Sequence, residues 1–273
     1  MKTEIKNPFE GLQKSAITTQ PAMTLIKPFI LLVSFWWITG SVNAQIPWEY
    51  TVKPGTWDYP VKPGTEQWKQ FRSNEEMADA CRIPENVLSA LSTDDLTELC
   101  LRYPLFTDFL AFENPKAGLD KLFRNFNGLR ELYQRPDVAK SLTKRYTEKI
   151  QSLSFLDGDN PDLEKGFFVL YVSIYEILLS RIEWKNSDEK EESKEVLQSL
   201  VAGFEGKMKY PDCFRGLFQT NFYARAHVLS KMDKTFVDRL PQKDENIVLQ
   251  TGMVTDEQTF HLINELSYSL IKP

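Results

Sequence analysis

Apolar residues recur at helical spacing along most of the chain, and no stretch keeps the strict alternation of a half-buried strand. Residues 119–133, 138–155 and 214–232 each place apolar side chains three and four positions apart, on one side of a helix. Residues 163–183 are apolar nearly all round, which predicts the central core helix. The best strand candidate, residues 246–250, is short. The pattern therefore predicts an all-α fold.

Helix-starting and helix-ending residues divide this pattern into short segments. Ser73, Thr93 and Thr255 stand where a side-chain oxygen can cap a helix N-terminus. Pro84 and Pro136 stand where a helix can begin without losing a hydrogen bond. Short turns join antiparallel neighbours. We expect an irregular helical bundle or short helical array of about 8–10 helices, preceded by an extended aromatic N-terminal arm.

The arm contains a short motif that occurs twice. Residues 50–56 and 59–65 share the pattern Tyr-x-Val-Lys-Pro-Gly-Thr. Proline followed by glycine fits the two central positions of a type II turn, because proline fixes its φ and glycine accepts a positive φ. Three tryptophans accompany the motif: Trp48, Trp57 and Trp68. The arm, residues 45–65, is expected either to pack its rings on the helical domain or to offer them to a sugar or a partner surface.

The segment before the arm has the pattern of a secretory signal peptide. Lys27 precedes a ten-residue apolar run, Phe29–Ile38, and Val42–Ala44 has the small residues of a cleavage site. A membrane-spanning helix needs about 20 apolar residues, so cleavage is favoured over an uncleaved anchor. Residues 1–44 are therefore predicted to be a signal peptide whose true start is Met23.

This reading sets the domain organisation and the location. Residues 66–273 are expected to form a single all-α domain behind the arm. The chain would be exported, to the periplasm of a bacterium or to the extracellular space, with no stable membrane insertion after cleavage.

Composition excludes several classes of function. The chain has 33 Lys and Arg against 38 Asp and Glu, a net charge of −5, and no basic stripe, so a nucleic-acid partner is not expected. The two histidines, His227 and His261, have no His or Cys at metal-ligand spacing, and no catalytic motif or cofactor motif occurs. Of three cysteines, Cys81 and Cys100 are the disulfide candidates; the alternative is buried, reduced thiols.

Two polar residues interrupt the apolar side of the helix predicted at 214–232. Asn221 and Arg225 fall in the middle of that stripe. An unpaired buried charge costs several kcal/mol, so Arg225 must either pair with a core acid such as Glu176 or open into a cleft. The second possibility makes Asn221 and Arg225 an anion-binding or substrate-orienting site. The other side of the helix is expected to be an exposed polar ridge, formed by Arg215, Gln219, Tyr223 and His227.

These observations favour a protein-interaction or scaffold module of the cell envelope, with another envelope or secreted protein as its partner. The alternative is a small-molecule or glycan binding protein that uses the Trp-rich arm or the Asn221/Arg225 site. A hydrolase whose site assembles only in three dimensions is a third possibility, although no catalytic residue is indicated. An interaction module should expose a broad apolar or aromatic patch, whereas a binder or an enzyme should have a polar pocket.

Overall fold

Every regular element in the described part of the chain is a helix, which confirms the all-α prediction. The computed structural model describes residues 57–112, 115–184, 190–251, 253–254 and 256–272. The signal segment, Trp48 and the first copy of the repeated motif lie outside the described residues.

The helices are shorter and more finely divided than the sequence pattern suggested. In chain order they are α3 (Glu66–Lys69), α4 (Asn74–Ala80), α5 (Glu85–Ala90), α6 (Thr93–Leu101), α7 (Pro115–Asn125), α8 (Asn127–Leu132), α9 (Val138–Gln151), α10 (Asp162–Leu179), α11 (Lys190–Lys207), α12 (Pro211–Phe214), α13 (Phe218–Met232), α14 (Phe236–Arg239), α15 (Gln242–Thr251) and α16 (Glu257–Ile271). Three 3₁₀ helices, η2 (Phe106–Ala111), η3 (Leu153–Asp157) and η5 (Arg215–Leu217), connect some of them.

When the short helices are left aside, α9 and α10 are consecutive in the chain, and so are α11 and α13. The members of each pair pack antiparallel. Between α9 and α10, Tyr146 bonds Glu176 while Lys149, one turn later, lies over the ring of Phe168, two turns earlier. Between α11 and α13, Asn221 bonds the carbonyl of Leu200, and Lys207 reaches back toward Thr220 near the start of α13. Each pair is therefore a helical hairpin, as short connections favour.

Two other pairs of helices, α6 with α9 and α9 with α11, pack parallel. Between α6 and α9, the hydroxyl oxygens of Thr97 and Ser141 lie 3.1 Å apart. Four residues further along α9, Arg145 Nη1 donates to Glu98 Oε1 at 2.8 Å. Between α9 and α11, Thr147 lies 3.2 Å from Ser199, and the contacts advance to Leu153 beside Gly206.

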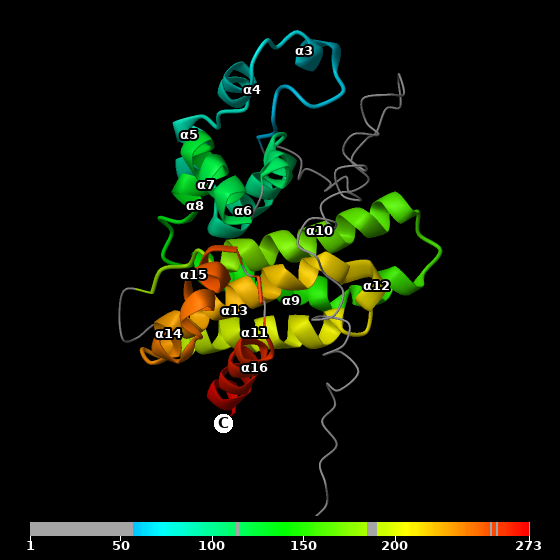
Figure 1. Ribbon diagram of the computed structural model, residues 1–273. Coiled ribbons are helices and arrows are strands. Elements are labelled where there is room, and N and C mark those ends of the chain that lie inside the picture. Colours follow the sequence, from blue (N-terminus) through cyan, green and yellow to red (C-terminus); the bar gives the residue numbers. More distant parts are fainter. Residues whose placement is uncertain (1–56, 113–114, 185–189, 252, 255, 273) are drawn as a thin grey trace, which may run out of the picture.

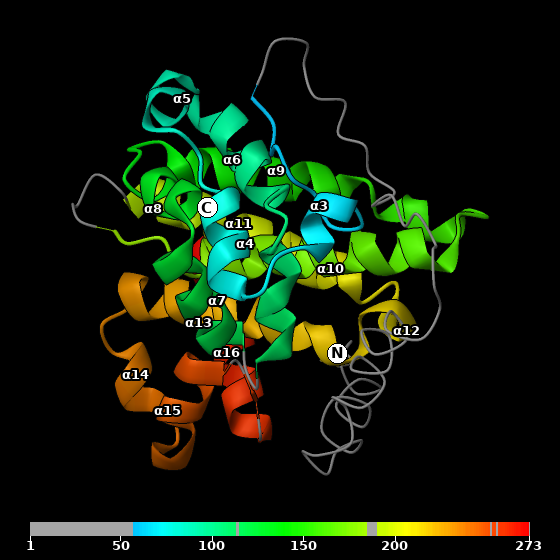
Figure 2. The same cartoon turned by 90° about the horizontal axis from the view of Figure 1, so that it is seen from above.

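The hairpins therefore stack as a short helical array with two rows. We call α6, α9 and α11 the first row, and α10 and α13 the second row. Figure 1 shows α10, α13 and α11 running side by side across the lower half of the molecule, with α3–α5 at one end and α14–α16 at the other. Figure 2, seen from above, places α3 and α4 over the middle of the long helices. In an array of this kind each helix pair buries its apolar faces against its neighbours.

Helix α10 is the centre of the core, as its all-round apolar character predicted. Every residue from Phe168 to Leu179 is buried, including Glu176. In the ranges that the structure covers, no helix is both long enough and apolar enough to cross a membrane.

The second copy of the repeated motif forms the predicted type II turn. Gly64 has φ +86°, and the N–H of Thr65 donates to the carbonyl of Lys62 at 3.3 Å. The Thr65 hydroxyl then accepts from the N–H of Trp68 and so caps α3. Tyr59, the first residue of the copy, is buried and donates its hydroxyl to the carbonyl of Leu99 at 3.0 Å. This part of the arm is thus packed on the helical body.

Two local predictions were wrong. Residues 246–250 belong to helix α15, because α15 packs on α13 and helical burial of Val248 replaces strand pairing. The expected polar ridge is exposed only in part: Arg215 is exposed, but Tyr223 is buried and His227 lies 2.8 Å from the carbonyl of Leu249 in α15.

We predict that Gly203→Ala destabilises the contact between α9 and α11. A Cβ at position 203 would lie 1.7 Å from the Tyr146 hydroxyl oxygen, which is itself held by Glu176 and cannot easily move. Overpacking of this kind costs about 1–3 kcal/mol of unfolding free energy, measurable by urea titration. The matched control is Gly166→Ala in α10, where no atom lies within 4 Å; it should gain up to about 1 kcal/mol. Equal stability of the two variants would contradict the packing argument.

Candidate functional site

Five polar side chains meet in the core where α9, α10, α11 and α13 pack together. We call them the core polar cluster; its members, all buried, are Tyr146, Glu176, Lys207, Thr220 and Asn221. Tyr146, Glu176, Lys207 and Asn221 have no exposed surface at all. Each comes from a predominantly apolar helix face, so each needs a partner to offset the loss of water.

The carboxylate of Glu176 is the centre of this cluster. Its Oε1 accepts from the Tyr146 hydroxyl at 2.7 Å and from Asn221 Nδ2 at 2.9 Å. Its Oε2 accepts from Lys207 Nζ at 2.5 Å and from the hydroxyl of Thr220. One carboxylate thus contacts an amine on one oxygen and an amide nitrogen on the other.

Lys207 is held in an environment that disfavours its charge. Burial lowers its pKa from the usual 10.5, and the neighbouring Glu176 carboxylate partly opposes that effect. Besides Glu176, Nζ donates to the carbonyl of Leu217 at 3.0 Å and lies 5.1 Å from the ring centre of Phe214. Sequence reasoning missed this residue, because a lysine at the end of a helix is ordinarily solvated.

Tyr146 extends the cluster toward α11. Burial raises the pKa of its hydroxyl well above 10.0, and the negative charge of Glu176 adds to the effect. The hydroxyl reaches Glu176 past Gly203, where a side chain would collide with it. The absence of a side chain at Gly203 therefore leaves the space that the Tyr146 hydroxyl needs to reach Glu176.

Arg225 is paired, but not with the acid suggested by the sequence. Its Nε donates to the hydroxyl of Ser267 at 3.0 Å, and Nη2 donates to Asn264 Oδ1 at 2.9 Å and to the carbonyl of Ile263 at 3.2 Å. All three partners belong to α16, whereas Glu176 is paired with Lys207. Burial lowers the pKa of Arg225 to about 10. The guanidinium therefore anchors α16, and it has no exposed surface through which to meet a ligand.

Two buried polar atoms on successive turns of α13 lack a hydrogen-bond partner within the described part of the chain. They are Oδ1 of Asn221, an acceptor, and Nη1 of Arg225, a donor. Residues four apart on a helix are neighbours on its surface. A buried acceptor and a buried donor are thus left unsatisfied one helical turn apart, at the edge of the core polar cluster.

The tryptophan candidates are packed rather than presented. Trp57 and Trp68 are both partly buried against the core. Trp57 makes an edge contact with Tyr59 at 5.0 Å between ring centres, and Trp68 makes one with Phe71 at 5.8 Å. Trp48 lies outside the described residues.

The two cysteines proposed to form a disulfide are unbonded in this structure. Cys81 and Cys100 are both free thiols without exposed surface, and the disulfide hypothesis stays a prediction. Burial raises the pKa of Cys81 to about 11, which keeps this thiol protonated and unreactive. Cys213 is also free, but it is exposed on α12.

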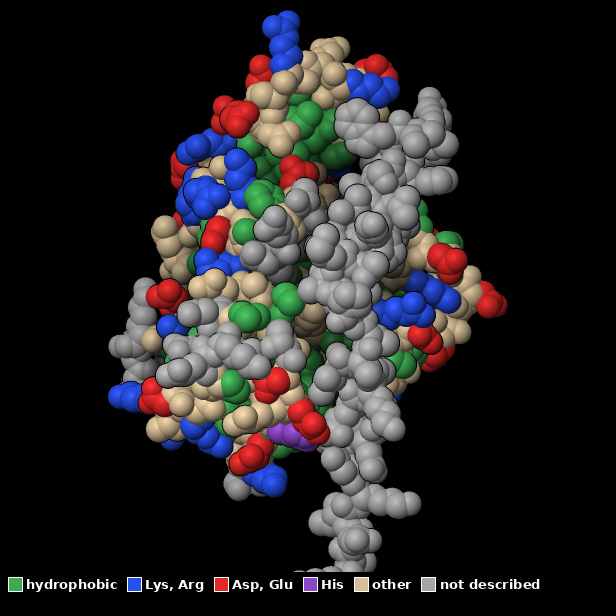
Figure 3. Space-filling model, viewed as in Figure 1, with side chains coloured by type: hydrophobic (Ala, Val, Ile, Leu, Met, Phe, Trp, Pro, Cys, Tyr) green, Lys and Arg blue, Asp and Glu red, His purple; other side chains and the backbone are tan. Residues whose placement is uncertain are grey.

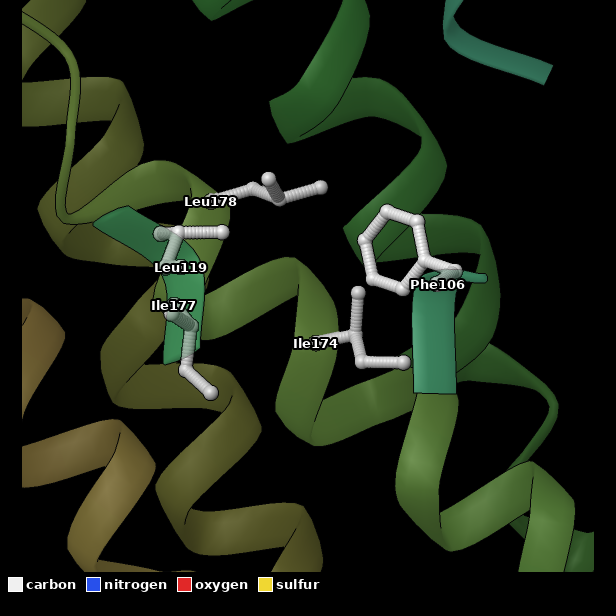
Figure 4. A pocket seen from close by; sticks show the side chains of 5 residues that line it. All are labelled: Phe106, Leu119, Ile174, Ile177 and Leu178. Carbon is white, nitrogen blue, oxygen red and sulfur yellow. The ribbon is translucent and has the colours of Figure 1, made fainter. Parts of the chain in front are cut away.

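The described residues contain no cluster that could hold a metal ion, and the hollow found among them is apolar. No group of three or more His, Cys, Asp or Glu side chains is placed to hold a metal ion within these ranges. A small hollow lies where α7 and α10 meet the 3₁₀ helix η2, as Figure 4 shows. Its lining is entirely apolar: Phe106, Leu119, Ile174, Ile177 and Leu178. Such a hollow supplies no group to orient a polar molecule.

We predict a large loss of stability when Lys207 alone is replaced by methionine. The change leaves the buried Glu176 carboxylate without its cation, and breaking such a pair costs about 3–5 kcal/mol. Adding Glu176→Gln removes the uncompensated charge and should restore a substantial part of that loss. Urea unfolding of the single and double variants measures both quantities.

The matched control for that comparison is Lys69→Met. Lys69 and Glu66 form an exposed ion pair on α3, and such a pair contributes less than about 1 kcal/mol. If the control destabilises the protein as much as Lys207→Met, burial is not the source of the effect.

We also predict acid sensitivity from His227. Burial lowers the pKa of His227 below 6.5. As the pH falls below 6.5, His227 is protonated first in the unfolded chain, because its pKa in the folded chain is lower. Protonation therefore favours the unfolded chain, and the unfolding free energy falls as the pH falls. The variant His227→Gln should flatten this dependence between pH 6.5 and about 5. His261→Gln, at an exposed position, should leave it as in the parent, and a parent curve that is already flat would contradict the prediction.

Comparison with known proteins adds no relative to this picture. No family model matches the chain, no curated protein matches it, and no solved structure matches it.

Proposed function

We propose that this chain is an exported protein-interaction or scaffold module whose partner is another envelope or secreted protein. The observation that supports this proposal is the stacking of helical hairpins with parallel neighbours. Arrays of this kind expose one row of helices as an extended surface, and many helical-repeat proteins bind their partners along such a surface. The signal-peptide pattern of residues 23–44 supports export.

The first row supplies the extended surface. Helices α10 and α13 of the second row are buried over most of their length, whereas α9 and α11 keep one exposed side. Exposed residues on that side include Lys144 and Glu148 of α9, and Gln198 and Ala202 of α11. A partner that contacts both helices would bind two helical hairpins at the same time.

The chemistry of the surface favours a polar, reversible interface. Among the described residues, Phe112 and Leu163 are the large hydrophobic side chains that are clearly exposed. Figure 3 shows acidic and basic side chains interspersed over the visible face, with small apolar areas between them. The broad apolar patch expected from the sequence is therefore not what supports the proposal. Non-obligate interfaces are about as apolar as ordinary protein surface, and their specificity comes from charge complementarity.

The test is site-directed photo-crosslinking of the full chain in cells that export it. A crosslinking amino acid at Lys144 or Gln198 should give one discrete adduct, whereas the same group at Lys234, an exposed position beyond α13, should not. Lys144→Glu should then weaken binding of the purified partner about tenfold, the effect of losing about 1.4 kcal/mol. Identical adducts at all three positions, or none at Lys144 and Gln198, would contradict the proposal.

A further inference from the structure

We propose that Lys207 and Asn221 form an intramolecular amide bond in the folded core, with Glu176 carrying the proton between them. The bond would link the end of α11 to α13 and release ammonia. The proposal concerns a covalent modification of the core and is independent of the interaction surface.

The nucleophile is the amine of Lys207. An amine reacts only when it is neutral, and lysine is activated for nucleophilic attack by removal from water. Nζ has no exposed surface, faces the ring of Phe214, and lies 2.5 Å from a carboxylate oxygen that can take its proton. Burial lowers its pKa, which favours the neutral form.

The same carboxylate contacts the group that must leave. Glu176 Oε2 faces Lys207 Nζ, and Glu176 Oε1 accepts from Asn221 Nδ2 at 2.9 Å. A proton taken from the amine on one oxygen is therefore available on the same carboxyl group to the amide nitrogen on the other. This is general acid–base catalysis with both heavy-atom contacts already within hydrogen-bond reach. The Thr220 hydroxyl lies beside the Lys207 amine and holds Glu176 Oε2 in place.

The unsatisfied pair on α13 supplies the remaining requirement. Attack on the Asn221 carbonyl carbon places negative charge on Oδ1, which has no hydrogen-bond partner among the described residues. Nη1 of Arg225, on the next turn of the same helix, is a buried N–H donor without a hydrogen-bond partner. It does not bond Oδ1 in this structure and would have to move toward it as the negative charge develops. A donor in a dry site stabilises a developing oxyanion strongly. The reaction would thus involve both Asn221 Oδ1 and Arg225 Nη1, which packing leaves without hydrogen-bond partners.

The reaction balances without any added reagent. Lys207 Nζ bonds to Asn221 Cγ, and the Asn221 Cγ–Nδ2 bond breaks. Counted from its protonated form, the Lys207 amine loses two protons, the first before attack and the second as the tetrahedral intermediate collapses. Glu176 passes both to Nδ2, which leaves as an ammonium ion. Glu176 is then a carboxylate again, nothing is oxidised or reduced, and the neutral mass of the chain falls by one ammonia. Such a link would stabilise a chain whose buried cysteines, Cys81 and Cys100, are unbonded.

The test is the intact mass of the full chain after purification and prolonged incubation at neutral pH, with helical circular dichroism as proof of folding. The expected result is a mass lower than that of the sequence by one ammonia. Proteolytic peptide mapping should then recover a branched peptide that joins residues 207 and 221, with no tryptic cleavage after Lys207. A folded protein with the unchanged sequence mass would overturn the proposal. Loss of one water, with a link from Lys207 to Glu176, would overturn the assignment to Asn221.

Peptide mapping is essential because two other sites can lose ammonia. A new N-terminal Gln45 can cyclise, and the Asn127–Gly128 sequence can form a succinimide. Loss found only at those positions would count against the proposal. The variants Glu176→Gln and Lys207→Arg should show no link. The matched control Lys149→Met removes another lysine that lies over a phenylalanine ring, that of Phe168, and should leave the link intact.

Discussion

The arrangement of the long helices depends on one buried carboxylate. Glu176 lies on the most apolar helix of the chain and has no exposed surface. A charge in that position is tolerated only if several donors converge on it. Tyr146 of α9, Lys207 of α11 and Asn221 of α13 do so, which means that three helices must meet α10 at one level. Apolar packing alone would allow those helices to slide by a turn at modest cost; the shared carboxylate fixes their register.

The array grows outward from that fixed point. Helices α9 and α10 form one hairpin, α11 and α13 form the next, and Arg225 of α13 holds α16 through Ser267 and Asn264. At the other side, Ser141 and Arg145 of α9 bond residues of α6, including Asp94 and Glu98. Polar contacts thus connect consecutive layers from α6 to α16. A rigid array of this kind suits a surface that must present two helices in constant geometry to a partner.

The same cluster connects stability with the proposed chemistry. In this dry site one carboxylate contacts both an amine and an amide. The site therefore contains, in fixed positions, the groups that an acyl transfer requires. Through their shared contacts with Glu176, Lys207 and Asn221 hold α11 and α13 together. The surface function and the core chemistry occupy different parts of the molecule, since the exposed side of α9 and α11 faces away from Glu176.

The sequence by itself determined the local features. Helical periodicity gave the all-α fold and the central helix α10, Ser73 gave the cap of α4, and Pro63–Gly64 gave the type II turn. Each depends on residues that are close in the chain, so a linear pattern contains the information. The anomaly at Asn221 and Arg225 was also visible as polar residues on an apolar stripe.

Only the tertiary structure decided which groups pair. Arg225 bonds α16 and not Glu176, because Lys207 reaches Glu176 from the end of α11. The strand candidate at 246–250 became helix α15, which packs on α13 and places the carbonyl of Leu249 against His227. These outcomes depend on contacts between segments 20 to 50 residues apart. Periodicity shows which face of a helix is buried, but not which distant helix covers it. Many apolar faces are nearly equivalent partners, and the pairing of buried polar groups makes one arrangement more stable than the others.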